Sequence, residues 1–332
     1  MNQLPAEANW AKFPGFGASP TIPPIMSSNY TRRQFVTFSS MAVGAVALAP
    51  SRMLGAQETA KRTAVDEVTL GRTGIKLSRL GMGTGVDGGK VQSALGKDTF
   101  IKLIHYAYDQ GIRYFDCAEA YSTFGWMADA IKGLPREKLF IQSKIDGKPA
   151  EILARIDSHR KNFDTDYVDS MLIHCMTRGT WTDEWKRIMD GFDEAKGRQW
   201  IRAKGVSCHD LPALRAAVAS DWTEVHLVRV NPQGHHVDGI VPEKWDKVSP
   251  SNDVTPVLAE LKTMHAKGRG VIGMKLIGNG EFKAAEDREK SIRFAMSRPE
   301  LSAVVVGFKA PSEVDEAIER INRALAEVPL AT

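Results

Sequence analysis

The chain has 332 residues, of which 43% are hydrophobic and 25% charged, and its formal net charge is +4. These values are ordinary for a soluble globular protein and allow one large α/β domain or two smaller ones. The net charge is small and no block of Lys and Arg stands out, so a nucleic-acid or anionic-membrane partner is not indicated.

The first predicted element is a signal segment over residues 1–56. Paired arginines, Arg32 and Arg33, precede an apolar run over residues 35–49, and small residues follow up to Ala56. A basic region, a short apolar region and a small-residue processing site follow each other in this order in signal peptides. The apolar run is shorter than the roughly 20 residues that a membrane-spanning helix needs, so we expect no stable membrane span. The alternative is a disordered tail that contains two arginines by chance.

This segment resembles a bacterial twin-arginine (Tat) signal. The resemblance implies that the Tat translocase exports the folded protein, often with its cofactor already bound, and that the protein is periplasmic. Cleavage of the signal stays open, because Leu54 is larger than the residue usually found three positions before a cut. A linker over residues 57–65 then leads to the fold, which we expect over residues 66–332.

A β-hairpin and eight strand–helix alternations are predicted after the linker. Residues 68–70 and 75–77 flank a glycine-containing turn, as in a hairpin. Short apolar runs then alternate with segments whose apolar residues recur at i, i+3, i+4 and i+7, the spacing of an amphipathic helix. The strands are expected over residues 80–84, 112–116, 139–144, 168–174, 201–207, 225–230, 271–275 and 303–306. A helix is expected after each of them, the last one beginning near Pro311.

This alternation predicts a parallel sheet covered by helices. Eight units in roughly 265 residues fit a closed (β/α)₈ TIM barrel, for which about 250 residues are typical. The alternative is an open, doubly wound sheet with fewer strands. Gly83, Gly85 and Gly88 form a G-x-G-x-x-G after a strand, but about ten residues separate Gly88 from Asp98, where helical spacing begins. A dinucleotide-binding fingerprint needs the helix at once, so we discount this motif.

Titratable residues lie at the C-terminal ends of three consecutive predicted strands. Asp116 ends the second strand, Lys144 the third and His174 the fourth, and Tyr121 follows in the loop after Asp116. Catalytic residues of a TIM barrel come from these strand ends, so we expect the four side chains to converge. Taken singly, each has a structural explanation: a packed tyrosine, a solvent-facing lysine, a turn-capping aspartate and a core histidine.

Together these residue types suit the reduction of a carbonyl group. The reaction needs a hydride and a proton for the developing alkoxide, and Tyr121 can act as the general acid. We expect the ammonium group of Lys144 to lower the pKa of this phenol, which is about 10 when unperturbed, and Asp116 to keep Lys144 charged. His174 would orient the carbonyl group or complete the proton path.

Five segments resemble successive blocks of the aldo-keto reductase family. They are LGRTGIKLSRLGMGTG, GIRYFDCAEAYS, REKLFIQSK, FDTDYVDSMLIH and IRAKGVS, and the resemblance extends over residues 66–325. It implies a catalytic tetrad of Asp116, Tyr121, Lys144 and His174, with NADPH extended across the barrel mouth and no Rossmann domain. Hydride would pass from the nicotinamide to an aldehyde or ketone, and an alcohol would be the substrate in the reverse direction.

The resemblance also implies a set of cofactor contacts. These are Gly83, Thr84, Ser207 and Asn231 at the nicotinamide half, Gly278 in the pyrophosphate loop, Lys309 near the adenosine 2′-phosphate and Glu316 at the adenine. Three positions at the nicotinamide depart from the usual residues: Cys208 replaces asparagine, Leu227 replaces glutamine and Met274 replaces an aromatic residue. Glu313 and Ala317 also depart from the common pattern. A lysine can recognise a phosphate as a point charge, so we favour NADP(H) and leave NAD(H) open. The alternative is that Lys309 is a solvated residue before a helix.

Several residues that could bind a metal have no role in this scheme. They are Cys117, Cys175, Cys208, His209, His235 and His236. An odd number of cysteines leaves at least one thiol without an intramolecular partner, and without a C-x-x-C pair a structural zinc site is not expected. Two functions other than carbonyl reduction stay open. One is a metal-dependent barrel enzyme, and the other is a low-turnover nucleotide-binding or partner protein that retains the fold.

Overall fold

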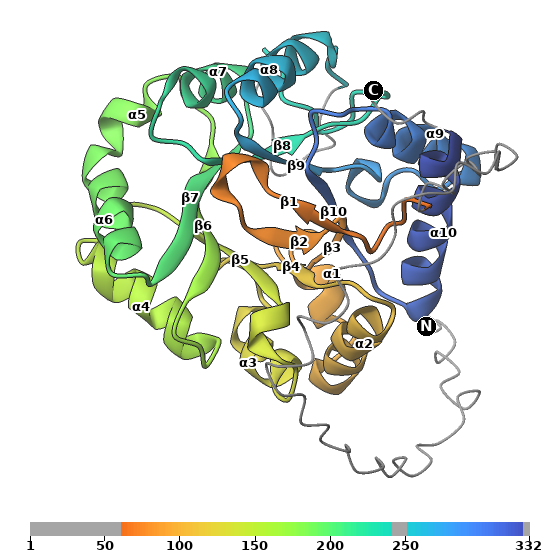
Figure 1. Ribbon diagram of the computed structural model, residues 1–332, viewed down its shortest axis with the longest axis horizontal. Helices are drawn as coiled ribbons and strands as arrows, with labels where there is room; N and C mark the ends of the chain where they lie inside the picture. Colours follow the sequence, from red (N-terminus) through yellow and green to blue (C-terminus); the bar gives the residue numbers. More distant parts are fainter. Residues whose placement is uncertain (1–60, 241–250, 328–332) are drawn as a thin grey trace, which may run out of the picture. The chain divides into compact units, whose positions relative to one another are not determined.

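The computed structural model describes residues 61–240 and 251–327 (Figure 1). The predicted signal segment and the first residues of the predicted linker lie outside this part of the chain. The chain packs on the barrel before residue 66, since the side chain of Ala64 is fully buried and its backbone N–H donates to Oδ1 of Asn322 (2.7 Å). No helix within the described ranges is long and apolar enough to cross a membrane.

Within these ranges, eight parallel strands close into a barrel in the order β10, β3, β4, β5, β6, β7, β8 and β9. They are β3 (Leu80–Gly83), β4 (Tyr114–Asp116), β5 (Phe140–Ile145), β6 (Val168–Met176), β7 (Ile201–Cys208), β8 (Val225–Arg229), β9 (Gly270–Met274) and β10 (Ala303–Gly307). The last strand pairs with the first, with Val304 opposite Leu80. This closure confirms the predicted (β/α)₈ barrel and excludes the open sheet.

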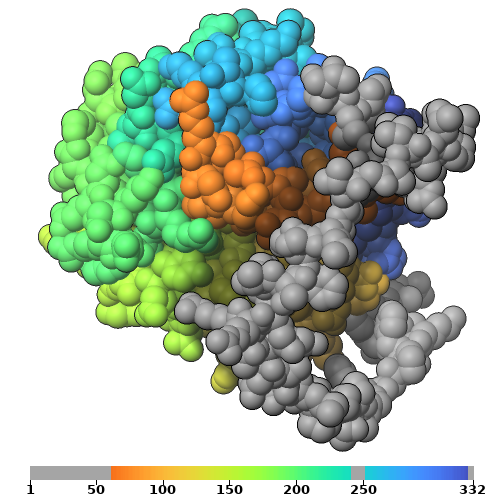
Figure 2. All heavy atoms as spheres, viewed as in Figure 1, coloured from red at the N-terminus to blue at the C-terminus, as the bar shows by residue number. Residues whose placement is uncertain are grey.

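The predicted hairpin precedes the barrel and covers one of its ends. Strands β1 (Glu67–Thr69) and β2 (Lys76–Ser78) pair in antiparallel fashion. Apolar residues of the hairpin segment, Leu70, Ile75 and Leu77, share a buried cluster with residues that begin barrel strands, such as Tyr114 and Phe140. Figure 2 shows the hairpin in orange on this face, between the green and blue parts of the barrel. The N-terminal ends of the strands are therefore closed, and the opposite end is left for a site.

Helices surround the barrel in Figure 1. They are α1 (Lys90–Ser93), α2 (Lys97–Asp109), α3 (Met127–Ile131), α4 (Ile152–Asn162), α5 (Trp181–Glu184), α6 (Lys186–Gly197), α7 (Leu211–Ala219), α8 (Thr255–Ala266), α9 (Ala285–Met296) and α10 (Pro311–Glu327). Their apolar stripes face inward. In α10, for example, Val314, Ala317, Ile321 and Ala324 are buried at the helical period.

The boundary after the seventh barrel strand differs from the prediction. The sequence pattern placed Lys275 in the strand, but β9 ends at Met274. Lys275 has φ of 63°, a left-handed conformation that ends an extended segment. This turn redirects the chain into the loop after β9, which contributes to the cavity described below.

A histidine in β8 makes the fold sensitive to acid. His226 is buried, and neither ring nitrogen has a hydrogen-bond partner among the described residues. Burial is the main cause that lowers the pKa of His226 to about 3, and the charges of Arg269 and Lys267 act in the same direction. The unfolded chain binds a proton here below about pH 6.5, whereas the folded protein does not. Stability is therefore lost as the pH falls from about 6.5 towards 3.

We predict that His226→Leu raises the melting temperature more at pH 5 than at pH 8. Leucine has no nitrogen to desolvate and takes up no proton on unfolding, so the gain at pH 5 should be larger by about 2 kcal/mol, or about 5 °C. Thermal unfolding at both pH values measures the difference. His265→Leu, which changes an exposed histidine of α8, is the matched control. An equal gain at the two pH values would contradict the prediction.

Candidate active site

A buried aspartate–lysine pair lies at the C-terminal ends of β4 and β5. Asp116 is the last residue of β4, and Lys144 belongs to the neighbouring parallel strand β5. Nζ of Lys144 lies 2.8 Å from each carboxylate oxygen of Asp116 and 2.7 Å from the carbonyl oxygen of Cys117. The two side chains are only 1% and 7% exposed. A buried charge is costly unless it is paired and hydrogen-bonded, so Asp116 stabilises the ammonium group of Lys144.

Gln142 supports the aspartate from β5. Its Nε2 donates to Oδ1 of Asp116 (2.8 Å) and to the hydroxyl oxygen of Tyr114 (2.9 Å). The sequence analysis missed this residue. Its position two residues before Lys144 in a strand was the available signal, because residues i and i+2 of a strand share a face.

Tyr121 brings its hydroxyl group to the same ammonium. The oxygen lies 3.2 Å from Nζ of Lys144. The tyrosine ring packs directly against Gly85, where a Cβ atom would lie 2.1 Å from Cζ of the ring. His174 lies beside the phenol, with the two ring centroids 5.6 Å apart in an edge-to-face arrangement. The structure thus brings the four predicted catalytic residues together.

The expected effect of Lys144 on the phenol is wrong. The pKa of Tyr121 is raised well above its usual value, first by burial and then by the carboxylate of Asp116. Asp116 neutralises the lysine at hydrogen-bond distance, so little positive field remains at the phenol to offset the lost hydration. Tyr121 therefore holds its proton at neutral pH, which is the state that a proton donor requires.

His174 is held by an aspartate that the sequence analysis missed. Burial of the ring opposes its protonation most strongly, but the hydrogen bond from Nδ1 to Oδ1 of Asp146 (2.7 Å) and the neighbouring Cys175 together outweigh it and raise the pKa of His174 to about 9. The strand β6 has an irregular register between Ile173 and Met176, and Cys175 has φ of 57°. Such irregularities redirect side chains near active sites. The signal for Asp146 was its place two residues after Lys144.

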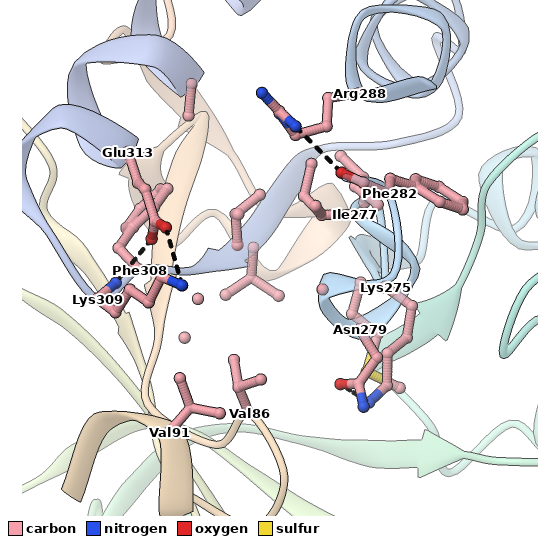
Figure 3. Close-up of a pocket in the computed structure, with 18 of the residues that line it drawn as sticks. Val86, Val91, Lys275, Ile277, Asn279, Phe282, Arg288, Phe308, Lys309 and Glu313 are labelled. Carbon is pink, nitrogen blue, oxygen red and sulfur yellow. Dashed lines mark hydrogen bonds and ion pairs between the residues drawn. The ribbon is translucent and has the colours of Figure 1, made fainter. Parts of the chain in front are cut away.

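A cavity of about 470 Å³ opens beside Asp116 and Tyr121 (Figure 3). Its lining extends from Gly83 and Gly85 through the loop after β9 to the first turns of α10, and it includes the predicted cofactor residues Lys309 and Glu316. Five cationic residues of the described chain line it, Lys275, Lys283, Arg288, Lys309 and Arg320, against three acidic ones, Asp116, Glu313 and Glu316. A net positive lining favours an anionic ligand.

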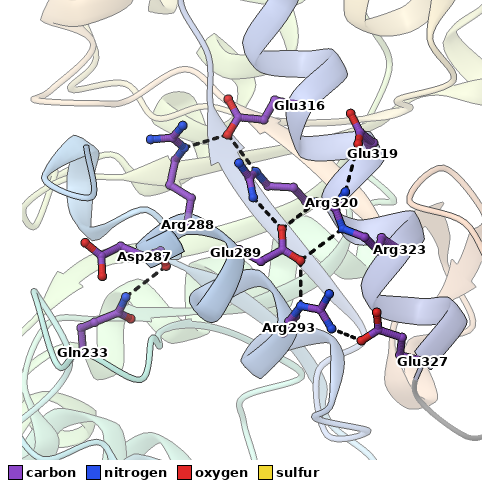
Figure 4. Close-up of polar contacts among 10 residues, drawn as sticks. All are labelled: Gln233, Asp287, Arg288, Glu289, Arg293, Glu316, Glu319, Arg320, Arg323 and Glu327. Atoms are coloured by element: carbon purple, nitrogen blue, oxygen red, sulfur yellow. Dashed lines mark hydrogen bonds and ion pairs between the residues drawn. The ribbon is translucent and has the colours of Figure 1, made fainter. Parts of the chain in front are cut away.

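The acidic residues at the α10 side of the cavity are engaged with cations. Glu313 accepts a hydrogen bond from the backbone N–H of Lys309 (2.8 Å), and its second oxygen lies 3.9 Å from the lysine Nζ (Figure 3). Glu316 accepts from Nε of Arg288 and of Arg320, each at 2.8 Å (Figure 4). These ion pairs hold the cationic side chains in place along the cavity wall.

Four of the predicted cofactor residues do not line the cavity itself. Thr84 donates its hydroxyl hydrogen to the backbone oxygen of Asp116 (3.0 Å), and Gly278 lies in a left-handed turn with φ of 52°. Ser207 and Asn231 are buried, and Oγ of the serine and Oδ1 of the asparagine make no hydrogen bond to the described residues. Buried polar atoms are usually satisfied, so these two atoms are suited to a polar ligand.

The cysteines and histidines left unassigned by the sequence do not form a common cluster in the described residues. All three cysteines lie in the described ranges and are free thiols, and Sγ of Cys175 lies 3.6 Å from Nε2 of His209. His235 and His236 each hydrogen-bond one carboxylate oxygen of Glu281 at 2.8 Å. No group of three or more His, Cys, Asp or Glu side chains in the described part of the chain is arranged to hold a metal.

The sequence model of the Aldo/keto reductase family matches residues 79–331. The chain belongs to this family. It is 30% identical over 189 residues to the NADPH-dependent codeinone reductase 1-5 of Papaver somniferum (49% of this chain, 57% of that protein). It is 31% identical over 160 residues to the aldo-keto reductase YhdN of Bacillus subtilis (43% and 47%). The chain thus spans about half the length of the curated relatives it matches.

Solved aldo-keto reductases share the fold over most of their length. A Bacillus halodurans enzyme in its holo form has a TM-score of 0.62 and 13% identity, covering 81% of this chain and 97% of that one. A Klebsiella pneumoniae enzyme in complex with NADPH has a TM-score of 0.59 and 15% identity, covering 80% and 92%. At these identities the likeness shows the fold.

We predict that Gly85→Ala displaces the phenol of Tyr121 and lowers the rate of any reaction in which this group transfers a proton by about 10²-fold. A misplacement of about 1 Å is enough for such a loss, because the reacting groups must be aligned. NADPH oxidation in the presence of aldehydes measures the effect. Gly125→Ala is the control, since an added Cβ there meets nothing within 4 Å. Rates equal to those of the wild type would show that Tyr121 tolerates the shift or takes no part.

Proposed function

We propose that this protein is an NADPH-dependent oxidoreductase that reduces an aldehyde or ketone by hydride transfer. One observation carries the proposal: the buried Nζ of Lys144 lies 2.8 Å from Asp116 and 3.2 Å from the hydroxyl oxygen of Tyr121, and both of these residues line a cavity with a net positive lining. Family membership supports the reaction class. The relative named as an NADPH-dependent reductase supports the cofactor.

Tyr121 acts as the general acid in this proposal. An alkoxide is a stronger base than a phenolate, so the proton moves to the carbonyl oxygen as negative charge develops there, although the pKa of the resting phenol is high. The ammonium group of Lys144 already donates to the phenol oxygen and stabilises the phenolate that is left. Asp116 keeps the amine charged inside the barrel.

The residues at the cavity fit NADP(H), which supplies the hydride when bound. The positive lining suits the phosphates of a dinucleotide, and Lys309 is a basic side chain at the start of α10. Gly83 leaves room for close approach of a ligand at the end of β3. The unpaired Oγ of Ser207 and Oδ1 of Asn231 would hold the carboxamide group of the nicotinamide.

We predict that Tyr121→Phe lowers the rate of NADPH oxidation with carbonyl substrates by at least about 10²-fold. The ring stays, but the proton donor is lost, and such donors contribute about 10²- to 10⁴-fold. The binding constant of NADPH and the melting temperature should change little. Tyr108→Phe, on α2 outside the barrel, serves as the matched control. Unchanged turnover in Tyr121→Phe would refute the assignment of the acid.

A second candidate is a low-turnover nucleotide-binding or partner protein. Cys208 and Leu227 favour it, because neither side chain offers the amide group that is usual at its position. Leu227 is instead buried with the apolar residues inside the barrel. A wild-type protein that binds NADPH but oxidises it with none of a broad panel of aldehydes, ketones and quinones would support this candidate over the reductase.

We further propose that the protein is exported to the periplasm by the Tat translocase. The support is the order of Arg32, Arg33 and the apolar run in the sequence, which lies outside the described residues. Lysine keeps the charge of arginine but not its planar fork of donors. We predict that changing both residues to lysine abolishes export, measured by immunoblotting of cell fractions. Arg52→Lys should export normally, and export of the double variant would contradict the proposal.

A further inference from the structure

His174 and Asp146 form a close pair at the ends of two neighbouring strands. His174 belongs to β6, and Asp146 directly follows β5, which pairs with β6 in parallel. Nδ1 of the histidine lies 2.7 Å from Oδ1 of the aspartate. The imidazole ring is 8% exposed, and the aspartate side chain is 38% exposed. A short hydrogen bond between a buried ring and a carboxylate is of the charge-assisted kind, which is about twice as strong as a neutral one.

The carboxylate of Asp146 serves this one ring. Its second oxygen, Oδ2, is buried and makes no hydrogen bond to the described residues. Burial is the largest effect on the acid and opposes its ionisation, but the hydrogen bond from His174 and the nearby positive charges together outweigh burial and lower the pKa of Asp146. The aspartate is therefore ionised at neutral pH, and its interaction is directed at Nδ1 of His174.

A chain of hydrogen bonds from neighbouring residues holds the backbone of Asp146 in place. Its backbone N–H donates to Oε1 of Glu119 (2.7 Å), and the other oxygen of Glu119 lies 3.0 Å from Nε2 of His159. Nδ1 of His159 in turn lies 2.9 Å from Oγ of Ser143, in β5. His159 is fully buried in α4. This chain of hydrogen bonds joins the loop after β4, the helix α4 and the strand β5, so it fixes Asp146 without any contribution from a substrate.

We propose that Asp146 is a positioning residue that keeps His174 in a cationic, hydrogen-donating state beside Tyr121. A carboxylate at Nδ1 requires a proton on that nitrogen, and in the imidazolium Nε2 carries one as well. The ring lies 5.6 Å from the ring of Tyr121, centroid to centroid. The ring is then a charge-assisted hydrogen-bond donor near the position where the carbonyl oxygen becomes negative. The proposal rests on the reductase function proposed above.

The groups around His174 are consistent with this role. The titratable and charged groups that face it are Asp146, Lys144, Cys175, Tyr121 and His209. Lys144 opposes a second cation, but Asp116 offsets it at 2.8 Å. Burial lowers the pKa of His209 well below its usual value, so that ring is neutral. The hydrogen bond of Cys175 acts in the same direction as that of Asp146. The hydrogen bond to Asp146 is thus the largest of the interactions that favour the charged form of His174.

The pH dependence of the reaction follows from this arrangement. The pKa of His174 is about 9, so the imidazolium is present at neutral pH and is lost as the pH rises through about 9. Without the carboxylate, burial is the largest effect and only Cys175 opposes it, so the pKa of His174 should fall below the ordinary histidine value of about 6.5. The alkaline limb of the pH–rate profile for carbonyl reduction should move with it.

The variant Asp146→Asn tests the proposal in the full chain. The imidazole resonances of His174, assigned with His174→Gln, are titrated by NMR, and kcat for NADPH-dependent reduction of an aldehyde is measured from about pH 6 to about pH 10. We expect a midpoint near 9 in the wild type and below about 6.5 in the variant. At pH 8 kcat should fall at least about tenfold, with the KM for NADPH unchanged. Asp146→Glu should restore part of the alkaline shift.

Asp129→Asn is the matched control, because it makes the same change at an exposed aspartate paired with Lys97 on the surface (2.6 Å). It should leave both the titration and the pH profile as in the wild type. A wild-type His174 that titrates at or below about 6.5, or a midpoint that is the same in Asp146→Asn, overturns the proposal even if the variant is poorly folded or inactive. A shifted midpoint with an unshifted rate profile also overturns it. A wild-type protein that reduces no carbonyl compound refutes the reductase function separately, whatever the titration shows.

Discussion

The ammonium group of Lys144 inside the barrel is the interaction on which the site depends. A buried ammonium group is costly unless it is paired and hydrogen-bonded, and here the carboxylate of Asp116 and the carbonyl oxygen of Cys117 supply these contacts. Those partners exist only because β4 and β5 are neighbours in parallel register. The same cation then fixes the hydroxyl group of Tyr121. The chemistry of the site is thus a consequence of strand pairing in the barrel.

The charged groups of the site have different roles, which become clear only when their contacts are considered together. Asp116 neutralises Lys144. The lysine therefore hydrogen-bonds the phenol oxygen of Tyr121 but exerts only a weak positive electrostatic field on it. The ring of His174 lies beside the phenol, and its partner Asp146 is partly exposed to solvent. The cavity wall beyond carries further cations, held by Glu313 and Glu316. A negatively charged dinucleotide and a carbonyl oxygen that gains charge would both meet positive groups along this path.

The alternation of apolar runs and helical spacing was enough to predict the barrel, because each strand is short and its helix follows at once. It was also enough to predict that Asp116, Lys144, His174 and Tyr121 lie together, since strand ends in a barrel meet. Gln142 and Asp146 were missed because their partners sit on adjacent strands, and only the register shows which side chains touch.

The pKa of Tyr121 was predicted in the wrong direction for a related reason. Its sign depends on the sum of burial, a cation and an anion at similar distances, and a sequence does not contain those distances. The end of β9 was misplaced by one residue because the left-handed conformation of Lys275 has no signature in its residue type. The local sequence pattern therefore predicts the helices and strands. The direction of a pKa shift that results from opposing electrostatic effects can be obtained only from the three-dimensional structure.

The pairing of β10 with β3 has a consequence for biosynthesis. Residues near position 80 must find partners near position 305, so the first barrel strand lacks one neighbour until the chain has been synthesised to about that position. Until then the nascent sheet has two open edges, which other chains could join. Closure of the barrel thus occurs late and joins residues that are far apart in the sequence. A truncation before residue 303 would leave an open sheet instead of a smaller closed barrel.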